Sequence, residues 1–244
     1  MTGPAVDGVL FDVDDTLVDT HGAFAEALAA VARSWLPHLD PARDAEVLAH
    51  WRADVGGRYR RYTRGEVSYR DQRMARANDL HATFGGPALD DDAYDRWNAL
   101  FEERFTGAWA AHADAAAVVR HLLDAGIKVG ALTNAATEYQ VRKLTRAGLA
   151  ADVPLLVGVD TLGFGKPDPR VFAEACRRLG TEPGRTAYVG DELDVDARAA
   201  TAAGLRGVWL ARPGLGSKGA NALAAVPTDV VIASLDELPA VLGV

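Results

Sequence analysis

The chain has 244 residues, of which 49% are hydrophobic and 25% are charged, and its net charge is −8. This length is enough for one large α/β domain or two lobes with a sizeable core, and the composition is that of a folded globular protein. The acidic balance argues against a nucleic-acid partner, because binding to DNA or RNA needs a basic surface. No apolar run approaches about 18 residues, so no membrane span and no membrane partner are expected.

Cysteine usage and the N-terminal sequence favour a cytoplasmic protein. Cys176 is the single cysteine, so no internal disulfide can form. It lies in a helical pattern and is expected to be a small core residue. No positively charged and apolar leader precedes the first strand, so no secretory signal is expected.

The first expected strand begins at Val9 and ends in acidic residues. An apolar, β-branched run leads into Asp12, Asp14 and Asp15, three acids within four residues. Neighbouring carboxylates repel each other, and their removal from water is costly. A divalent cation would stabilise the group and would bring a phosphate within reach of a carboxylate nucleophile. Taken alone, the segment could also be an acidic turn that caps the next helix.

The segment 20–108 has no convincing strand run. Helical spacing of apolar residues recurs through it, and the breaks fall at Pro37, Pro41, Gly56–Gly57 and Gly85–Gly86. We therefore predict an all-helical insert made of several short helices.

From Asp114 onward, expected helices and strands alternate. The helices are expected at 115–126, 137–148, 169–180, 196–204 and 235–243. The strands are expected at 127–133, within 153–160, and at 185–191, 207–211 and 229–233. This alternation implies βαβ units and a mostly parallel sheet, to which the first strand must also belong. The predicted fold class is thus α/β, a Rossmann-like parallel sheet over 1–19 and 107–244 with a helical domain inserted at 20–106.

Polar residues follow several of the expected strands, where ligands bind in an open α/β sheet. Thr133 and Asn134 offer a hydroxyl and backbone N–H groups that suit an anion. Lys166 lies in a loop after the next strand, and Asp191 ends another, with Asp196 beyond it. Taken singly, these could be a helix N-cap, a solvated lysine and a charged helix start. Their combination with the first acidic turn is hard to explain by coincidence.

These residues resemble the four motifs of the haloacid dehalogenase superfamily, most of whose members are phosphatases. The segment 12–16 matches the first motif, DxDxT, and Thr133, Lys166 and Asp191 match the other three. The match spans residues 6 to about 211, and the helical insert resembles the type 1 α-helical cap of that superfamily. These motifs are specific to the superfamily and not to a substrate.

The resemblance implies a mechanism and a cofactor. It makes Asp12 the nucleophile, which forms an aspartyl-phosphate, and Asp14 the acid and base that serves the leaving alcohol and the attacking water. It also implies Mg²⁺ bound by the Asp12 carboxylate, the Asp14 backbone carbonyl and Asp191.

Substrate-binding residues are implied in the core and predicted in the insert. By resemblance, Thr133 and the Asn134 N–H would hold phosphoryl oxygens, and Lys166 would balance charge in the transition state. Among the many arginines of the insert, Arg58 and Arg61 are candidates for gripping an anionic substrate. The alternative for both is a solvated helix face paired with acidic residues.

The identity of Asp14 favours phosphate-ester hydrolysis among the reactions of the superfamily. Halide displacement needs no proton on the leaving group, and the dehalogenases carry a non-acid at this position. The phosphonate hydrolases use a cap lysine, and 20–108 contains no lysine. A dehalogenase or a phosphomutase remains an alternative, and a non-catalytic binding module is disfavoured because every expected catalytic group is present. The expected partner is a small phosphorylated metabolite, with the protein a monomer or a homodimer.

Overall fold

The computed structural model describes residues 6–63, 65–215 and 230–244. The chain divides into two compact units, one formed by Met1–Thr20 with Trp109–Val244 and the other by His21–Ala108. We call the first the core unit and the second the helical unit, and each is described by itself.

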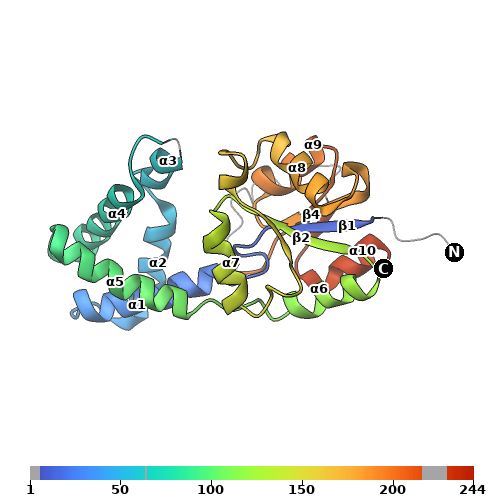
Figure 1. Ribbon diagram of the computed structural model, residues 1–244. Coiled ribbons are helices and arrows are strands. Elements are labelled where there is room, and N and C mark those ends of the chain that lie inside the picture. The colour runs from blue at the N-terminus through green and yellow to red at the C-terminus, as the bar shows by residue number, and fades with distance from the viewer. Residues whose placement is uncertain (1–5, 64, 216–229) are drawn as a thin grey trace. The chain divides into compact units, whose positions relative to one another are not determined.

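The core unit contains a six-stranded parallel sheet in the order β3-β2-β1-β4-β5-β6. The strands are β1 (Gly8–Phe11), β2 (Lys128–Leu132), β3 (Leu155–Val157), β4 (Thr186–Gly190), β5 (Arg206–Leu210) and β6 (Val230–Ile232). All residues of β1 and β4 are buried, as their unbroken apolar sequences predict for inner strands of a parallel sheet. The predicted α/β class and parallel sheet are confirmed (Figure 1).

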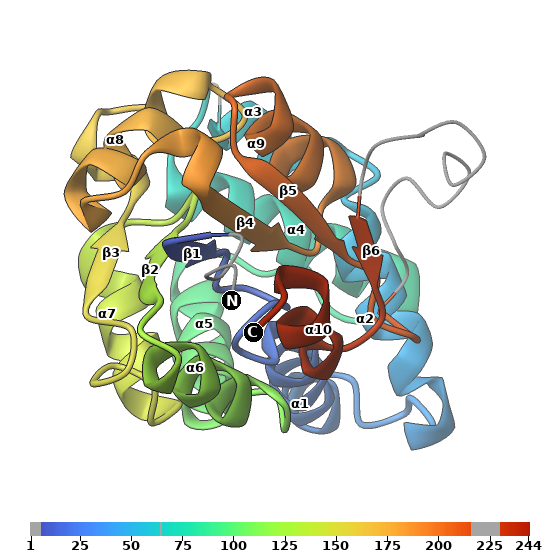
Figure 2. The same ribbon diagram turned by 90° about the vertical axis from the view of Figure 1, so that its right-hand side faces the viewer.

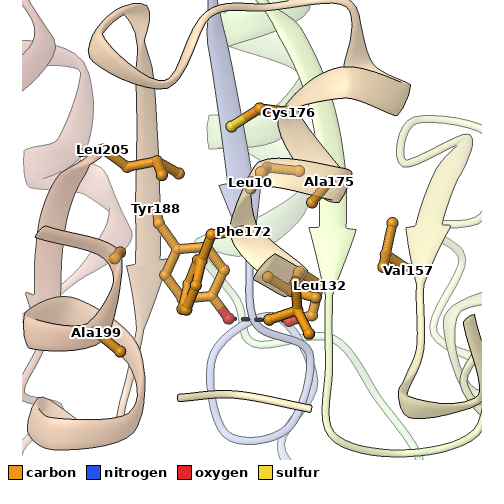
Figure 3. Close-up of a cluster of buried hydrophobic side chains, with 11 residues drawn as sticks. Leu10, Leu132, Val157, Phe172, Ala175, Cys176, Tyr188, Ala199 and Leu205 are labelled. Atoms are coloured by element: carbon orange, nitrogen blue, oxygen red, sulfur yellow. Dashed lines mark hydrogen bonds between the residues drawn. The ribbon is translucent and has the colours of Figure 1, made fainter. Parts of the chain in front are cut away.

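Helices cover both faces of this sheet. They are α6 (Ala115–Asp124), α7 (Thr137–Arg146), α8 (Pro169–Leu179), α9 (Arg198–Ala202) and α10 (Leu238–Leu242). Figure 2 shows α6 and α10 together on one face and α8 and α9 on the other. On the second face, Phe172 of α8 meets Tyr188 of β4 edge-on, with ring centroids 5.1 Å apart (Figure 3). Cys176 is buried in the same cluster, as predicted.

The helical unit is all-helical in its described residues, which confirms the predicted insert between β1 and β2. Its helices are α1 (Thr20–Trp35, whose first residue belongs to the core unit), α2 (Asp44–Ala53), α3 (Arg58–Thr63), α4 (Tyr69–Phe84) and α5 (Asp91–Gly107). The Ser68 and Asp90 side chains cap the starts of α4 and α5 by accepting backbone N–H bonds. Stacked rings of Trp51, Trp97 and Phe101 form the centre of this unit. Across the described part of the chain, no helix has the length and apolarity that a membrane span requires.

Arg212, in the loop after β5, and Asp114, just before α6, form a hydrogen-bond network that joins separate segments of the core unit. Arg212 donates two bonds of 2.8 Å to the Asp114 carboxylate and one of 3.0 Å to the Thr16 carbonyl. Asp114 also accepts bonds of 2.9 Å from the Ser234 hydroxyl and the Leu235 N–H. Burial raises the pKa of Asp114, but these hydrogen bonds and the Arg212 charge outweigh it and lower the pKa to about 2.

Replacing Asp114 by asparagine is expected to lower the free energy of unfolding by about 1–2 kcal/mol at pH 7, after allowance for solvent screening. Because the pKa of Asp114 is lower in the folded chain than its ordinary 3.8, its stabilisation is complete above pH 4 and is lost as the pH falls toward 2. Urea unfolding at pH 6 and pH 3 measures this, and the difference between wild type and variant should shrink at the lower pH. Asp124→Asn, a change at an exposed carboxylate, is the control. A difference independent of pH would contradict the assignment.

Candidate active site

The carboxyl ends of three adjacent strands bring the predicted motif residues together. In the sheet, β1 lies between β2 and β4, and Phe11 pairs with Ala131 on one side and Val189 on the other. The residues that follow these strands therefore lie at one edge of the sheet. This places Asp12 beside Asp191 in space, although 178 residues separate them along the chain.

Lys166 is the centre of a buried polar network at this edge. Its ammonium group donates bonds of 2.7 Å to Asp12 Oδ1, to Asp196 Oδ1 and to the Tyr188 hydroxyl. These three bonds use the three N–H donors of the ammonium group. The Tyr188 hydroxyl in turn donates a 2.9 Å hydrogen bond to the Leu132 carbonyl, the contact drawn in Figure 3. Burial lowers the pKa of Lys166, but the charges of Asp12 and Asp196 outweigh it and hold the pKa well above its ordinary value.

Asn134 fixes the backbone of Lys166. The Asn134 side chain donates to the Lys166 carbonyl at 2.9 Å and accepts from the Lys166 N–H at 2.6 Å. A Cβ at Gly165 would overlap the Asn134 side chain, so glycine permits this close approach. The sequence analysis assigned the Asn134 backbone N–H to the substrate; its side chain has this separate role, which the sequence did not indicate.

Asp191 lies close to the two carboxylates that bind Lys166, and the three form a cluster. Oxygens of Asp12, Asp191 and Asp196 lie within 4.8 Å of one another, and this group is called the carboxylate cluster below. Burial, and then the charges of the neighbouring carboxylates, raises the pKa of Asp191, and burial likewise raises the pKa of Asp12 against the opposing charge of Lys166. A nearby positive charge would therefore favour the ionised form of the cluster.

The donor set fits a magnesium ion. When ionised, three carboxylates beside one ammonium leave a net charge of −2, which one divalent cation neutralises. Carboxylate oxygens are the hard ligands that Mg²⁺ prefers. Of the three residues that the sequence analysis assigned to the metal, Asp12 and Asp191 lie in the cluster, and the Asp14 carbonyl stays a prediction. Asp196 completes the cluster through its side chain.

The local backbone explains how Asp196 reaches this cluster. A single π-helical turn, Leu193–Ala197, precedes α9, whereas the sequence predicted one helix over 196–204. Such wide turns are frequently found at functional sites. Asp196 accepts a 2.9 Å bond from the Glu192 N–H, and its side chain packs where a Cβ on Gly190 would overlap it. Glycine at 190 therefore leaves the space that Asp196 occupies.

Asp14 lies next to a different set of donors. Its carboxylate accepts bonds of 2.6 Å from the Thr20 hydroxyl and from Gln140 Nε2, and it forms an ion pair with Lys143. Burial raises the pKa of Asp14, but the Lys143 charge and these hydrogen bonds outweigh it and hold the pKa below its ordinary value. The sequence analysis missed Gln140 and Lys143. Both lie on the face of α7 that is buried with Leu144, but two polar residues give no apolar signal of this face in the sequence.

Thr133 lies at the end of β2, as predicted, and is buried. Its hydroxyl oxygen accepts bonds from the Ala135 N–H at 3.2 Å and from Gln140 Nε2 at 3.1 Å. Gln140 thus links Thr133 to Asp14, that is, the second motif to the first.

The two arginines proposed for the substrate belong to the helical unit. Arg58 lies 3.4 Å from Asp79, and Arg61 lies 3.3 Å from Glu66. These are exposed or half-exposed pairs of the kind that the alternative interpretation expects. Arg58 also lines a cavity of about 380 Å³ together with Trp51 and Arg76. Contact of either arginine with a substrate stays a prediction.

A family profile described as "haloacid dehalogenase-like hydrolase" matches residues 6–204 of the chain. The chain belongs to this family. The match covers β1 to α9 and includes every residue of the network around Lys166.

Two curated phosphatases are similar to this hydrolase in sequence. Ribulose-1,5-bisphosphate 5-phosphatase of Halopiger xanaduensis is 30% identical over 207 residues, which is 82% of each chain. Glyceraldehyde 3-phosphate phosphatase of Methanopyrus kandleri is 38% identical over 99 residues, which is 41% of this chain and 42% of that protein. The second alignment thus spans less than half of the relative's length.

Three solved structures share the fold of this hydrolase. A hydrolase of the same type from Bacillus subtilis, bound to magnesium, has a TM-score of 0.74 at 22% identity and covers 98% of this chain and 99% of that one. A family member from Deinococcus radiodurans R1, with bound phosphate and sodium, has a TM-score of 0.73 at 26% identity, with 98% and 96% covered. An L-2-haloacid dehalogenase has a TM-score of 0.72 at 26% identity, with 98% and 99% covered.

Proposed function

We propose that this hydrolase is a Mg²⁺-dependent phosphatase that hydrolyses a small phosphorylated metabolite through an aspartyl-phosphate on Asp12. One observation carries the proposal: Asp12 and Asp196 are buried against a single ammonium group, and Asp191 joins them in the carboxylate cluster. Such a cluster suits a divalent cation, and the cation permits a phosphate dianion to approach a carboxylate. The named activities of the two curated relatives agree with this substrate class.

In the first step, the Asp12 carboxylate attacks phosphorus and the bond from phosphorus to the leaving oxygen breaks. A protonated Asp14 gives its proton to the departing alkoxide. Lys166 holds one Asp12 oxygen in place by its 2.7 Å bond, and the Thr133 hydroxyl and the Asn134 N–H are the proposed donors to phosphoryl oxygens. Magnesium, when bound by the carboxylate cluster, supplies charge neutralisation at the phosphoryl group.

In the second step, water attacks the phosphorus of the aspartyl-phosphate and inorganic phosphate leaves. Asp14 takes a proton from this water and thereby returns to its first state. The ion pair with Lys143 favours the charged form of Asp14, which is the form that Asp14 reaches once it has given its proton to the leaving group in the first step. Asp12 is released as a carboxylate and returns to Lys166.

Phosphate release from p-nitrophenyl phosphate tests the proposal directly. Purified protein should release phosphate with Mg²⁺ and stop when EDTA is added, and a panel of phosphorylated sugars, nucleotides and organic acids should then reveal the preferred substrate. Release that persists in EDTA would contradict the metal requirement. No release from any phosphate ester would contradict the phosphatase assignment.

A 2-haloacid dehalogenase is the second candidate, because an L-2-haloacid dehalogenase shares the fold at 26% identity. Halide leaves without a proton, so this reaction gives no role to the carboxylate of Asp14 and its three donors. Halide release from 2-chloropropionate in EDTA distinguishes the two reactions. We expect none.

A further inference from the structure

We propose that Gln140 and Lys143 of α7 are positioning residues that orient Asp14 toward the leaving oxygen and the Thr133 hydroxyl toward the phosphoryl group. This inference rests on the proposed phosphatase function and extends it to two residues outside the four motifs. All the groups concerned belong to the core unit.

The Asp14 carboxylate is held from two sides. Lys143 and the Thr20 hydroxyl bind Oδ1, while Gln140 Nε2 binds Oδ2. Contacts on both oxygens fix the rotation of the carboxylate plane, which a single contact would leave free. The Asp14 side chain still exposes 36% of its surface, so it remains accessible to a substrate.

The hydrogen-bond roles of Gln140 then determine those of Thr133. A carboxylate only accepts, so the Gln140 amide must turn its NH₂ group toward Asp14. The second hydrogen of the same NH₂ group is donated to the Thr133 hydroxyl oxygen, which lies 3.1 Å from Gln140 Nε2. The Ala135 N–H occupies another acceptor position of that oxygen. Neither bond uses the Thr133 hydroxyl hydrogen, which is the hydrogen that a phosphoryl oxygen would accept.

Gln140 and Lys143 are buried, and the burial of polar side chains lowers the stability of the folded chain unless their contacts compensate for it. Lys143 is 2% exposed and Gln140 is fully buried, although a helix stripe that packs on a sheet is ordinarily apolar. The Lys143 ammonium lies 5.4 Å from the ring of Trp109 and 5.3 Å from that of Tyr139. An apolar residue at position 143 would pack there without burying a charge, and it would need no partner to compensate for that burial. We therefore attribute the presence of Gln140 and Lys143 at these buried positions to their contacts with Asp14 and Thr133.

The dependence on the leaving group separates this role from a merely structural one. Two probes are compared: p-nitrophenyl phosphate, whose phenolate leaves without help, and benzyl phosphate, whose alkoxide needs a proton. Lys143→Met should lower kcat for benzyl phosphate about 100-fold and for p-nitrophenyl phosphate less than about 5-fold, since general acid catalysis contributes at least about 100-fold. The KM values should change less than about 2-fold, because substrate binding is not altered.

A double-mutant cycle with Asp14→Asn tests whether Lys143 acts through Asp14. In that background, Lys143→Met should cause no further loss of kcat for benzyl phosphate. Arg142→Met is the matched control, because Arg142 is the adjacent residue of α7 and is exposed. It should leave both rates unchanged. If Lys143→Met does not fold, Gln140→Met removes no charge and must also slow benzyl phosphate more than p-nitrophenyl phosphate.

The outcomes distinguish this inference from the proposed function. A wild-type protein without phosphatase activity would overturn the proposed function itself. With an active wild type, equal losses on both substrates, no loss on either, or additive losses in the cycle would each overturn the positioning role.

Discussion

Replacing Asp12 by asparagine is expected to abolish phosphate release, with a loss in kcat of at least about 10³-fold. Asparagine keeps the shape of the side chain and can still accept the 2.7 Å bond from Lys166. It cannot attack phosphorus as a carboxylate does, and it removes one negative charge from the carboxylate cluster. The chemistry is therefore lost while the network around Lys166 is largely kept.

The stability of the same variant provides an internal check. Because Asp12 faces the buried carboxylate of Asp196 and the half-buried one of Asp191, its neutralisation relieves repulsion, so the melting temperature in EDTA should be unchanged or higher. Activity is measured as phosphate release with Mg²⁺, and unfolding is followed by circular dichroism. Asp194→Asn, at an exposed acid of the π-helical turn, is the control and should keep wild-type activity. Retention of more than about a tenth of the wild-type kcat would rule Asp12 out as the nucleophile.

The sequence predicts the sheet and the residues at its edge because both depend on local patterns. Apolar runs end at Asp12, Thr133 and Asp191, and parallel strands bring their carboxyl ends to one edge. Lys166 was also predicted from its loop, and its partners Asp12 and Asp196 from the strand ends. Tyr188 could not be, since it points from the middle of a buried strand.

The features that sequence reasoning missed depend on tertiary packing. Gln140 and Lys143 look like ordinary helix-surface residues in sequence, and only the packing of α7 in the core unit shows that they are buried. Within the π-helical turn, Asp196 contacts Glu192 and Lys166, and no helix propensity encodes these contacts. The roles of Arg58 and of Arg61 are undecided for a related reason, because a charged helix face has the same pattern whether it binds acids or a substrate.

The second large effect is expected for Lys166→Met, which removes the ammonium group from the carboxylate cluster. Asp12 and Asp196 would lose their 2.7 Å bonds to Lys166 and remain buried as unbalanced charges. Loss of one partner from a buried ion pair costs about 3–5 kcal/mol, so the variant should unfold at a clearly lower temperature in EDTA. Its kcat with Mg²⁺ should fall about 10²–10³-fold, as for the loss of one electrostatic contact to the transition state.

Magnesium should stabilise this variant more than it stabilises the wild type. Without the ammonium group, the ionised cluster carries a charge of −3 in place of −2, so a divalent cation relieves more repulsion. The measurement is the shift in melting temperature between EDTA and saturating Mg²⁺ for each protein. Lys128→Met applies the same substitution to an exposed lysine and should reproduce the wild-type shift. A Lys166→Met protein that is as stable as the wild type in EDTA, or that Mg²⁺ stabilises no more, would mean that Lys166 does not balance the cluster. Lys166 contributes both a positive charge and a hydrogen bond to the Asp12 oxygen. A larger Mg²⁺ shift together with a low kcat would separate these two contributions, because the metal can replace the charge but not the hydrogen bond.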